Sequence, residues 1–142
     1  MQNVVIDTNV IVSAFINPLG VPAQVLELLL TSDTVQIWVS PEILSEYEVV
    51  LSRDKFSRFP NFWHEVALFL DALDGFAMQA TPARRLQGLL SEPEDHKFLE
   101  LAAEVNADFL ITGNTTHFTM KEFKGTRIVT PTEYWTQSNQ HP

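Results

Sequence analysis

The stretch Val4-Val5-Ile6-Asp7-Thr8-Asn9, followed by Val10-Ile11-Val12, decides the fold. Three apolar residues end on an acid, and an apolar pattern resumes after two small polar residues. This pattern predicts a buried strand that ends at Asp7 and a helix that starts directly after it. In open parallel α/β sheets the ligand site lies at the carboxyl ends of the strands, so Asp7 is expected at the mouth of the first strand. An equal alternative is that Asp7 or Thr8 only caps the following helix.

The composition indicates one folded domain over residues 1–142, with the last few residues expected as a disordered tail. A chain of 142 residues with 45% hydrophobic residues can bury a real core. It has no Cys, which excludes disulfides, thiolate metal sites and thiol nucleophiles. No basic leader and no apolar run of membrane-spanning length is visible, so a cytoplasmic protein without a membrane partner is expected.

The net charge of −9 argues against nucleic-acid binding through a broad basic face. The alternative is that some carboxylates converge on a site that divalent cations neutralise, because hard cations prefer oxygen ligands. Most of the 18 acids are expected on a solvated surface.

Strand and helix patterns alternate along the chain, which implies βαβ crossovers. We therefore predict a three-layer α/β/α sandwich with a central parallel sheet of about four to five strands. Helices are expected near residues 8–16, 22–31, 41–51, 62–73, 91–105 and from 131, and strands near 35–39, 76–78 (weak), 109–112 and 127–130.

Two acids on the helix after Ser40-Pro41 are candidates for a buried role. Glu46 and Glu48 flank its apolar stripe on opposite sides, and periodicity does not separate them.

A further candidate, Asp95, lies about 50° from the centre of the apolar stripe of its helix, at about 100° per residue. Ser91 and Glu94 form a capping-box pattern before it, which leaves Asp95 free for another role, although capping remains an alternative. On the same helix His96 is expected at the surface, with Lys97, Glu100 and Glu104 opposite the apolar stripe.

The strand at 109–112 also ends in small polar residues, Gly113-Asn114-Thr115-Thr116-His117, and so mirrors the first strand. No Gly-rich phosphate loop, nucleophile elbow or metal-ligand spacing of histidines is present. A dehalogenase-type phosphatase needs a second acid two residues after the first, and Asn9 excludes it. Asp7, Asp95 and Glu46 or Glu48 could not stay ionised together without a cation, so a Mg²⁺ or Mn²⁺ site is expected, as in metal-dependent nucleases.

The runs VVIDTNVIVSAF, SPEILSEYEVVLSR, PEDHKFLELA and ADFLITGN resemble, in this order, the PIN domain family. They are most similar to its bacterial branch described as toxin components of toxin–antitoxin pairs, the VapC-like ribonucleases. The resemblance selects Glu46 over Glu48, because Glu46 begins an E-x-x-x-x-L-x-R pattern that runs to Leu51 and Arg53. It implies that Asp7, Glu46 and Asp95 hold the metal and act in catalysis.

The same resemblance implies hydrolysis of single-stranded RNA with Mg²⁺ or Mn²⁺, a small antitoxin partner and, in many members, a homodimer. Thr8, Asn9, Thr112 and Asn114 would orient ligands or bind phosphate and water. The fourth motif departs from the family, because Asn114 and His117 stand where many members carry acids. One or two metals are therefore both compatible with the sequence.

Residues 53–63 interleave basic and aromatic side chains, a mixture that can bind RNA, although core packing with a dimer contact is the favoured interpretation. The competing functional hypothesis is a PIN-like module that binds RNA or a protein without cutting. The acidic charge and the altered fourth motif motivate it.

Overall fold

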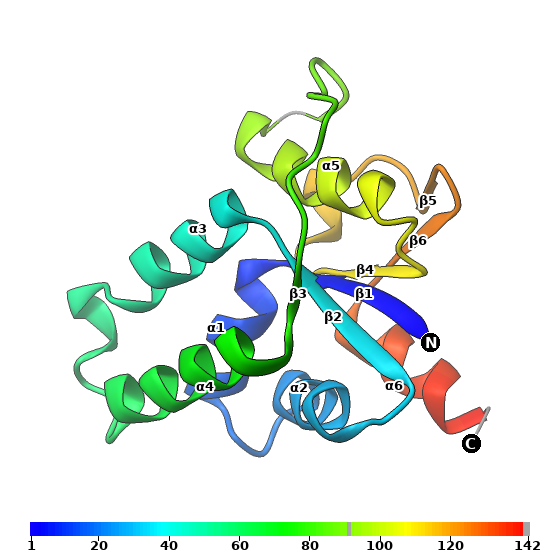
Figure 1. Ribbon diagram of the computed structural model, residues 1–142. Coiled ribbons are helices and arrows are strands. Elements are labelled where there is room, and N and C mark those ends of the chain that lie inside the picture. The colour runs from blue at the N-terminus through cyan, green and yellow to red at the C-terminus, as the bar shows by residue number, and fades with distance from the viewer. Residues whose placement is uncertain (91, 141–142) are drawn as a thin grey trace.

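A computed structural model describes residues 1–90 and 92–140 and arranges them as a sheet with helices on both faces (Figure 1). The strands are β1 (Gln2–Ile6), β2 (Val35–Val39), β3 (Met78–Gln79), β4 (Phe109–Ile111), β5 (Glu122–Phe123) and β6 (Thr126–Val129). The helices are α1 (Thr8–Ile16), α2 (Val21–Thr31), α3 (Pro41–Leu51), α4 (Phe62–Phe76), α5 (His96–Glu104) and α6 (Pro131–Gln140). Short 3-10 turns cover Asp54–Phe56, Pro93–Asp95 and Thr115–His117.

The described strands form one six-stranded sheet in the order β3-β2-β1-β4-β6-β5. Every neighbouring pair is parallel except β5 with β6, which is antiparallel. The centre of the sheet is β1, where Val4 is paired with Ile37 on one side and with Phe109 on the other. The predicted fold class is confirmed. The weak strand predicted near 76–78 forms as β3, and β5 is an additional two-residue strand that is too short to give a sequence pattern.

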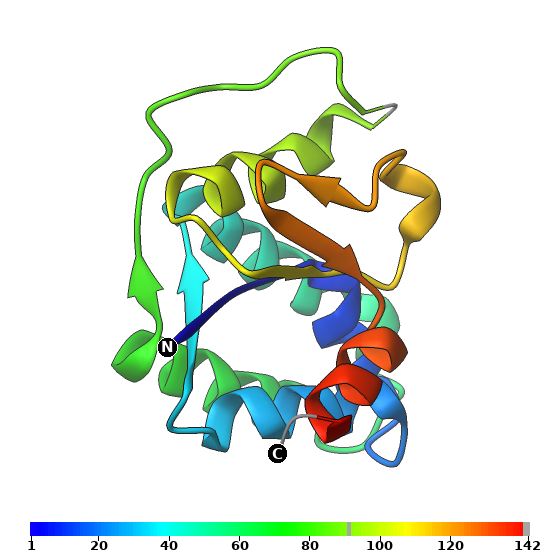
Figure 2. The same cartoon turned by 90° about the vertical axis from the view of Figure 1, so that its right-hand side faces the viewer.

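Helices cover both faces of the sheet, as Figure 2 shows: α5 lies on one face, and α2 and α6 lie on the other. The first helix packs against α2, α3 and α4. Because both faces are covered, Val4, Val5 and Leu110 are fully buried, and these strands read as continuous apolar runs. Together the strands and helices place the carboxyl ends of β1, β2 and β4 along one edge of the sheet.

The basic–aromatic segment 53–63 buries Phe56 and Phe62, leaves Trp63 47% exposed, and keeps its charges in solvent. Phe56 and Phe62 are buried and stack with ring centroids 4.8 Å apart. Arg53, Lys55 and Arg58 are exposed. The core packing that was favoured for this segment is confirmed for Phe56 and Phe62, and the dimer contact stays a prediction.

The polar face of α5 is buried, which contradicts the prediction for His96, Lys97 and Glu100. Their exposed fractions are 7%, 7% and 5%, respectively. The reason is the connector between β3 and α5, which arches over this helix (Figure 2) and covers the side that the apolar stripe does not. A prediction from helical periodicity assumes that a helix packs through one face only. Helix α5 packs through two, its apolar stripe against the sheet and its polar side against the connector.

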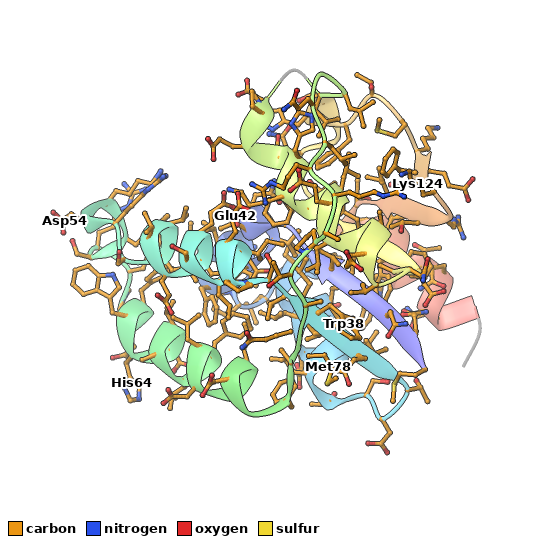
Figure 3. All side chains as sticks on the ribbon, turned by 45° about the horizontal axis from the view of Figure 1, so that its top comes forward. Trp38, Glu42, Asp54, His64, Met78 and Lys124 are labelled. Atoms are coloured by element: carbon orange, nitrogen blue, oxygen red, sulfur yellow. The ribbon has the colours of Figure 1, made fainter. Side chains whose placement is uncertain are left out.

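Backbone amides of the connector bind three side chains that are four residues apart on α5. Leu90 donates to His96 Nε2 (3.2 Å), Leu86 to Glu100 (2.7 Å) and Ala83 to Glu104 (2.7 Å). Arg85 also bridges Glu100 and Glu42, which lies at the start of α3 (Figure 3). Through the hydrogen bonds that His96 and Glu100 accept, the connector is therefore tied to α5, the helix that Asp95 precedes.

Several boundaries differ from the predictions by one to three residues, as element ends commonly do. The helix expected from residue 91 differs more, because Pro93–Asp95 form a 3-10 turn and α5 begins at His96. Helix α4 continues to Phe76, which moves the weak strand to Met78–Gln79, beside Trp38 of β2 (Figure 3). The last strand covers 126–129 rather than 127–130. Ser91 of the predicted capping box, and residues 141–142 of the predicted tail, lie outside the described residues.

Among the described residues, no single helix has the length and apolar composition needed to cross a membrane. Helices α1 and α2 meet the test only as a pair, with a bend of 111° between them.

Replacing Glu100 with Ala should lower the free energy of unfolding by about 2 kcal/mol or more, because it leaves the Leu86 N–H without its buried acceptor and frees Arg85. Glu104→Ala is the matched control: Glu104 also accepts an N–H, but it is exposed, and its loss should be about 1 kcal/mol or less. Urea unfolding of both variants in EDTA measures the difference. Equal losses would mean that the connector is not held through the buried position.

Candidate active site at the carboxyl edge of the sheet

The site lies where β1 and β4 end side by side. Asp7 follows β1 and Thr112 follows β4, and the Asp7 N–H donates to the Ile111 carbonyl at 2.9 Å. The parallel register therefore brings together two polar residues that are far apart in the chain.

The carboxylate of Asp7 is 5% exposed and is held by neutral donors. Thr112 Oγ1 donates to Asp7 Oδ2 at 2.8 Å, and Asn9 Nδ2 donates to the same oxygen at 3.3 Å. Asn9 is fixed in turn by the Gly113 N–H, which donates to its Oδ1 at 2.9 Å. Asp7 stands at the N-cap position of α1 but makes no side-chain capping bond, so the capping alternative for Asp7 is wrong.

Burial raises the pKa of Asp7 to about 6 from its usual 3.8. The hydrogen bond from Thr112 opposes this change, and the nearby charges of Asp95 and Glu46 add to it. An acid with a raised pKa beside two other carboxylates is characteristic of sites that bind cations or transfer protons.

Helix α3 brings Glu46 to the site. Ser40 caps this helix as predicted, accepting from the Ile43 N–H at 3.1 Å. The Tyr47 hydroxyl donates to the Ile6 carbonyl at 2.5 Å and so ties α3 to the end of β1. Glu46 is partly buried, whereas Glu48 is exposed. The structure thus turns Glu46 toward Asp7 and leaves Glu48 in solvent.

Both carboxylate oxygens of Glu46 already have donors from the chain. The Thr8 hydroxyl donates to Oε2, and the Lys97 ammonium donates to Oε1 at 2.5 Å. Burial disfavours the charge on Lys97, but the hydrogen bond and the charge of Glu46 outweigh burial and raise the pKa of Lys97. The Lys97 contact was not predicted, although the spacing Asp95-x-Lys97 places both residues at the start of α5, Asp95 as its N-cap and Lys97 in its first turn.

Asp95 enters from the start of α5, where it makes no side-chain capping bond. His117 Nδ1 lies 2.8 Å from Asp95 Oδ2, yet this buried oxygen has no aligned hydrogen-bond partner among the described residues. Burial raises the pKa of Asp95, His117 partly offsets the rise, and the charges of Glu46 and Glu92 add to it. A buried carboxylate oxygen whose nearest donor, His117, is poorly aligned keeps acceptor capacity for a proton or a cation.

The fourth motif is built on Thr112 and joins the site through His117. Asn114 donates its N–H to Thr112 Oγ1 at 3.1 Å, and its amide nitrogen lies 2.9 Å from His117 Nε2. The side chain that replaces the family's acid therefore contacts Asp95. His117 was not among the predicted site residues, and its replacement of an acid is the signal that could have found it.

Every predicted site residue lies in this region, but the three carboxylates do not form a closed ligand set. Among the described residues, no group of three or more His, Asp or Glu side chains is arranged to hold a metal ion. The donors nevertheless fit a hard divalent cation, because they are carboxylate oxygens, one of them has only a poorly aligned contact with His117, and burial disfavours the charge on Asp7.

Comparison with known proteins gives the family. The PIN domain model matches residues 3–116. An uncharacterized protein of Methanocaldococcus jannaschii is 32% identical over 111 residues, covering 78% of this chain and 70% of that protein. The crystal structure of VapBC2 from Rickettsia felis, bound to a DNA fragment from their promoter, matches with a TM-score of 0.62 and 19% identity over 91% of this chain and 98% of that one.

The chain therefore belongs to the PIN domain family. PIN domains are generally nucleases that use divalent metal ions, and the family assignment supports a nuclease here.

The raised pKa of Asp7 predicts a pH-dependent stability in EDTA. Protonated Asp7 is favoured in the folded protein, so its contribution is complete below the unfolded pKa of 3.8 and is lost as the pH rises through about 6. The shift corresponds to about 3 kcal/mol. Because Asp7→Asn cannot ionise, the unfolding free energy of wild type minus that of the variant should fall by most of this amount between pH 4 and pH 7. A difference that does not change with pH would show that Asp7 titrates normally.

Proposed function

We propose that this protein is a metal-dependent endoribonuclease that hydrolyses phosphodiester bonds of single-stranded RNA with Mg²⁺ or Mn²⁺. The observation that carries the proposal is the buried Asp7 carboxylate, whose pKa is raised by burial and by the neighbouring charges of Asp95 and Glu46. A carboxylate kept out of water beside two others is costly unless a cation is bound, which gives the burial a functional reason.

Asp7, Glu46 and Asp95 would hold the cation, which when bound neutralises phosphate oxygens and lowers the pKa of water. Asp95 has a buried oxygen whose contact with His117 is poorly aligned, and Asp7 accepts only from neutral groups. These two would be the readiest ligands. Glu46 would join them against competition from the Lys97 ammonium, which already contacts one of its oxygens.

The supporting residues would keep the ligands in place. Thr112 orients Asp7 and also accepts the Asn114 N–H, so one hydroxyl connects the first and fourth motifs. Asn9 bridges Asp7 to the backbone of Gly113. Thr8 holds Glu46. Thr8 and Asn114 could then exchange their present partners for phosphate or water.

The hollow that we assign to the RNA shares Lys97 with the site, and Asp7, Glu46 and Asp95 do not line it. A cavity of about 530 Å³ lies between the connector, the start of α3 and α5, and Lys97 is on its wall. The lining combines apolar side chains (Leu86, Leu90 and Pro93) with polar ones (Glu42, Arg85, Gln87, His96, Lys97 and Glu100). This mixture suits a base and its sugar–phosphate better than it suits a purely apolar ligand.

We also propose a small antitoxin as the protein partner. The proposal is supported by the similar structure from Rickettsia felis, which is that of VapBC2 bound to a DNA fragment from their promoter. An apolar groove of about 610 Å³ between α1, α2 and α4 provides a surface of the kind that a protein partner needs. A homodimer is compatible with the same family pattern.

The second candidate function, a module that binds RNA or protein without cutting, is favoured by one observation. Both oxygens of Glu46 are occupied by Thr8 and Lys97, as in a site that needs no metal.

Incubation of labelled single-stranded RNA with the protein separates the two functions. We expect cleavage with Mn²⁺ or Mg²⁺, none in EDTA, and a loss of about a hundredfold or more in Asp7→Asn. Single-stranded DNA and duplex RNA, as parallel substrates, test the specificity. Absent cleavage, or equal cleavage by Asp7→Asn, would leave only the binding module.

A matched pair of variants on α3 tests the register of the site. Glu46→Gln should reduce cleavage about a hundredfold, because a neutral amide is a poor ligand for a hard cation. Glu48→Gln, the same change two residues away on an exposed side chain, should stay within about twofold of wild type. The reverse order of effects would assign the second acid to Glu48.

A further inference from the structure

Lys97 is a buried cation in the middle of the acidic site. Its side chain is 7% exposed, and its ammonium lies 2.5 Å from Glu46 Oε1. The next carboxylate is Glu94, whose Oε2 lies at 3.4 Å and whose side chain is 85% exposed. Lys97 therefore has one close, largely buried partner and one distant partner that reaches into solvent.

The ammonium occupies an oxygen that a divalent cation would need. Glu46 has two carboxylate oxygens, and the second already accepts from the Thr8 hydroxyl. Bringing a doubly charged ion to Glu46 must therefore break the Lys97 contact or place two cations against each other in a site that excludes much of the solvent. Either event weakens metal binding, because charges interact strongly where water is excluded.

We propose that Lys97 is the resident counter-ion of Glu46 and competes with a divalent cation for that carboxylate, so that it sets how tightly the site binds metal. The inference rests on the proposed metal site. Asp7 and Asp95 would take the ion first, and Glu46 would follow when Lys97 leaves. Glu94, three residues earlier on the same turn, gives the released ammonium a partner at the surface.

Binding of Mn²⁺ to the complete, RNA-free protein tests the competition. Lys97→Met keeps the length of the side chain and removes the charge, and it should tighten Mn²⁺ binding about tenfold or more. Lys97→Arg keeps the charge and should bind Mn²⁺ no more tightly than wild type. Isothermal titration calorimetry or the electron paramagnetic resonance signal of free Mn²⁺ gives the dissociation constants.

Lys55→Met is the matched control for the change in net charge. Lys55 is exposed and lies beside Asp54, at the opposite end of α3 from Glu42 (Figure 3). Its removal should leave the Mn²⁺ dissociation constant within about twofold, because exposed charges beyond a Debye length are screened.

Thermal unfolding gives a second readout that does not depend on activity. Without metal, Lys97→Met leaves Glu46 without its ammonium, so the Tm of the variant should lie below that of wild type. Mn²⁺ should then raise the Tm of the variant by more than it raises the wild-type Tm. Lys97→Gln, which keeps a polar end, provides a second uncharged variant if Lys97→Met does not fold.

Mn²⁺ binding that is equal or weaker in the folded uncharged variant would overturn the competition, as would no Mn²⁺ binding by any variant. Tighter Mn²⁺ binding by Lys97→Met, together with no RNA cleavage by the wild-type protein, would support the role of Lys97 and contradict the proposed nuclease. A failure of the Lys97 proposal can therefore be told apart from a failure of the proposed function.

Discussion

The burial of one carboxylate, that of Asp7, is the constraint on which the arrangement around it depends. The carboxyl end of β1 lies between β2 and β4, so a side chain placed there is enclosed by its neighbours. Thr112 at the end of β4 satisfies one oxygen, and Tyr47 fixes α3 against the last residue of β1. The sheet therefore determines both where the acid lies and which residues surround it.

Negative charge accumulates at this edge, and the chain compensates for it only in part. Lys97 pairs with Glu46, and His117 lies against Asp95, whereas Asp7 has only neutral hydrogen-bond donors. Burial raises the pKa of Asp7, and the described residues of the protein place no cation beside this carboxylate to offset the effect. Two partly compensated acids and one uncompensated acid are what a site needs if it is to accept a cation and remain folded without one.

Much of this fold could be predicted from the sequence because strands buried on both faces are continuous apolar runs that end at polar residues. The ends of β1 and β4 carry that signal at Asp7 and Thr112. The edge strands β3 and β5 do not, since two residues show no periodicity. The buried face of α5 was missed for a different reason: His96 and Glu100 are polar and pack under a connector that has no pattern of its own. Contacts such as that between Lys97 and Glu46 join residues 51 positions apart, and only the tertiary structure reveals them.

The most direct test is a crystal structure of the protein grown or soaked with Mn²⁺ and recorded at a wavelength at which manganese scatters anomalously. A metal site built on Asp7 predicts an anomalous peak in contact with the carboxylates of Asp7 and Asp95, and no such peak in crystals of Asp7→Asn. Ordered Asp7 and Asp95 side chains with no peak between them, in crystals that bind Mn²⁺ elsewhere, would contradict it.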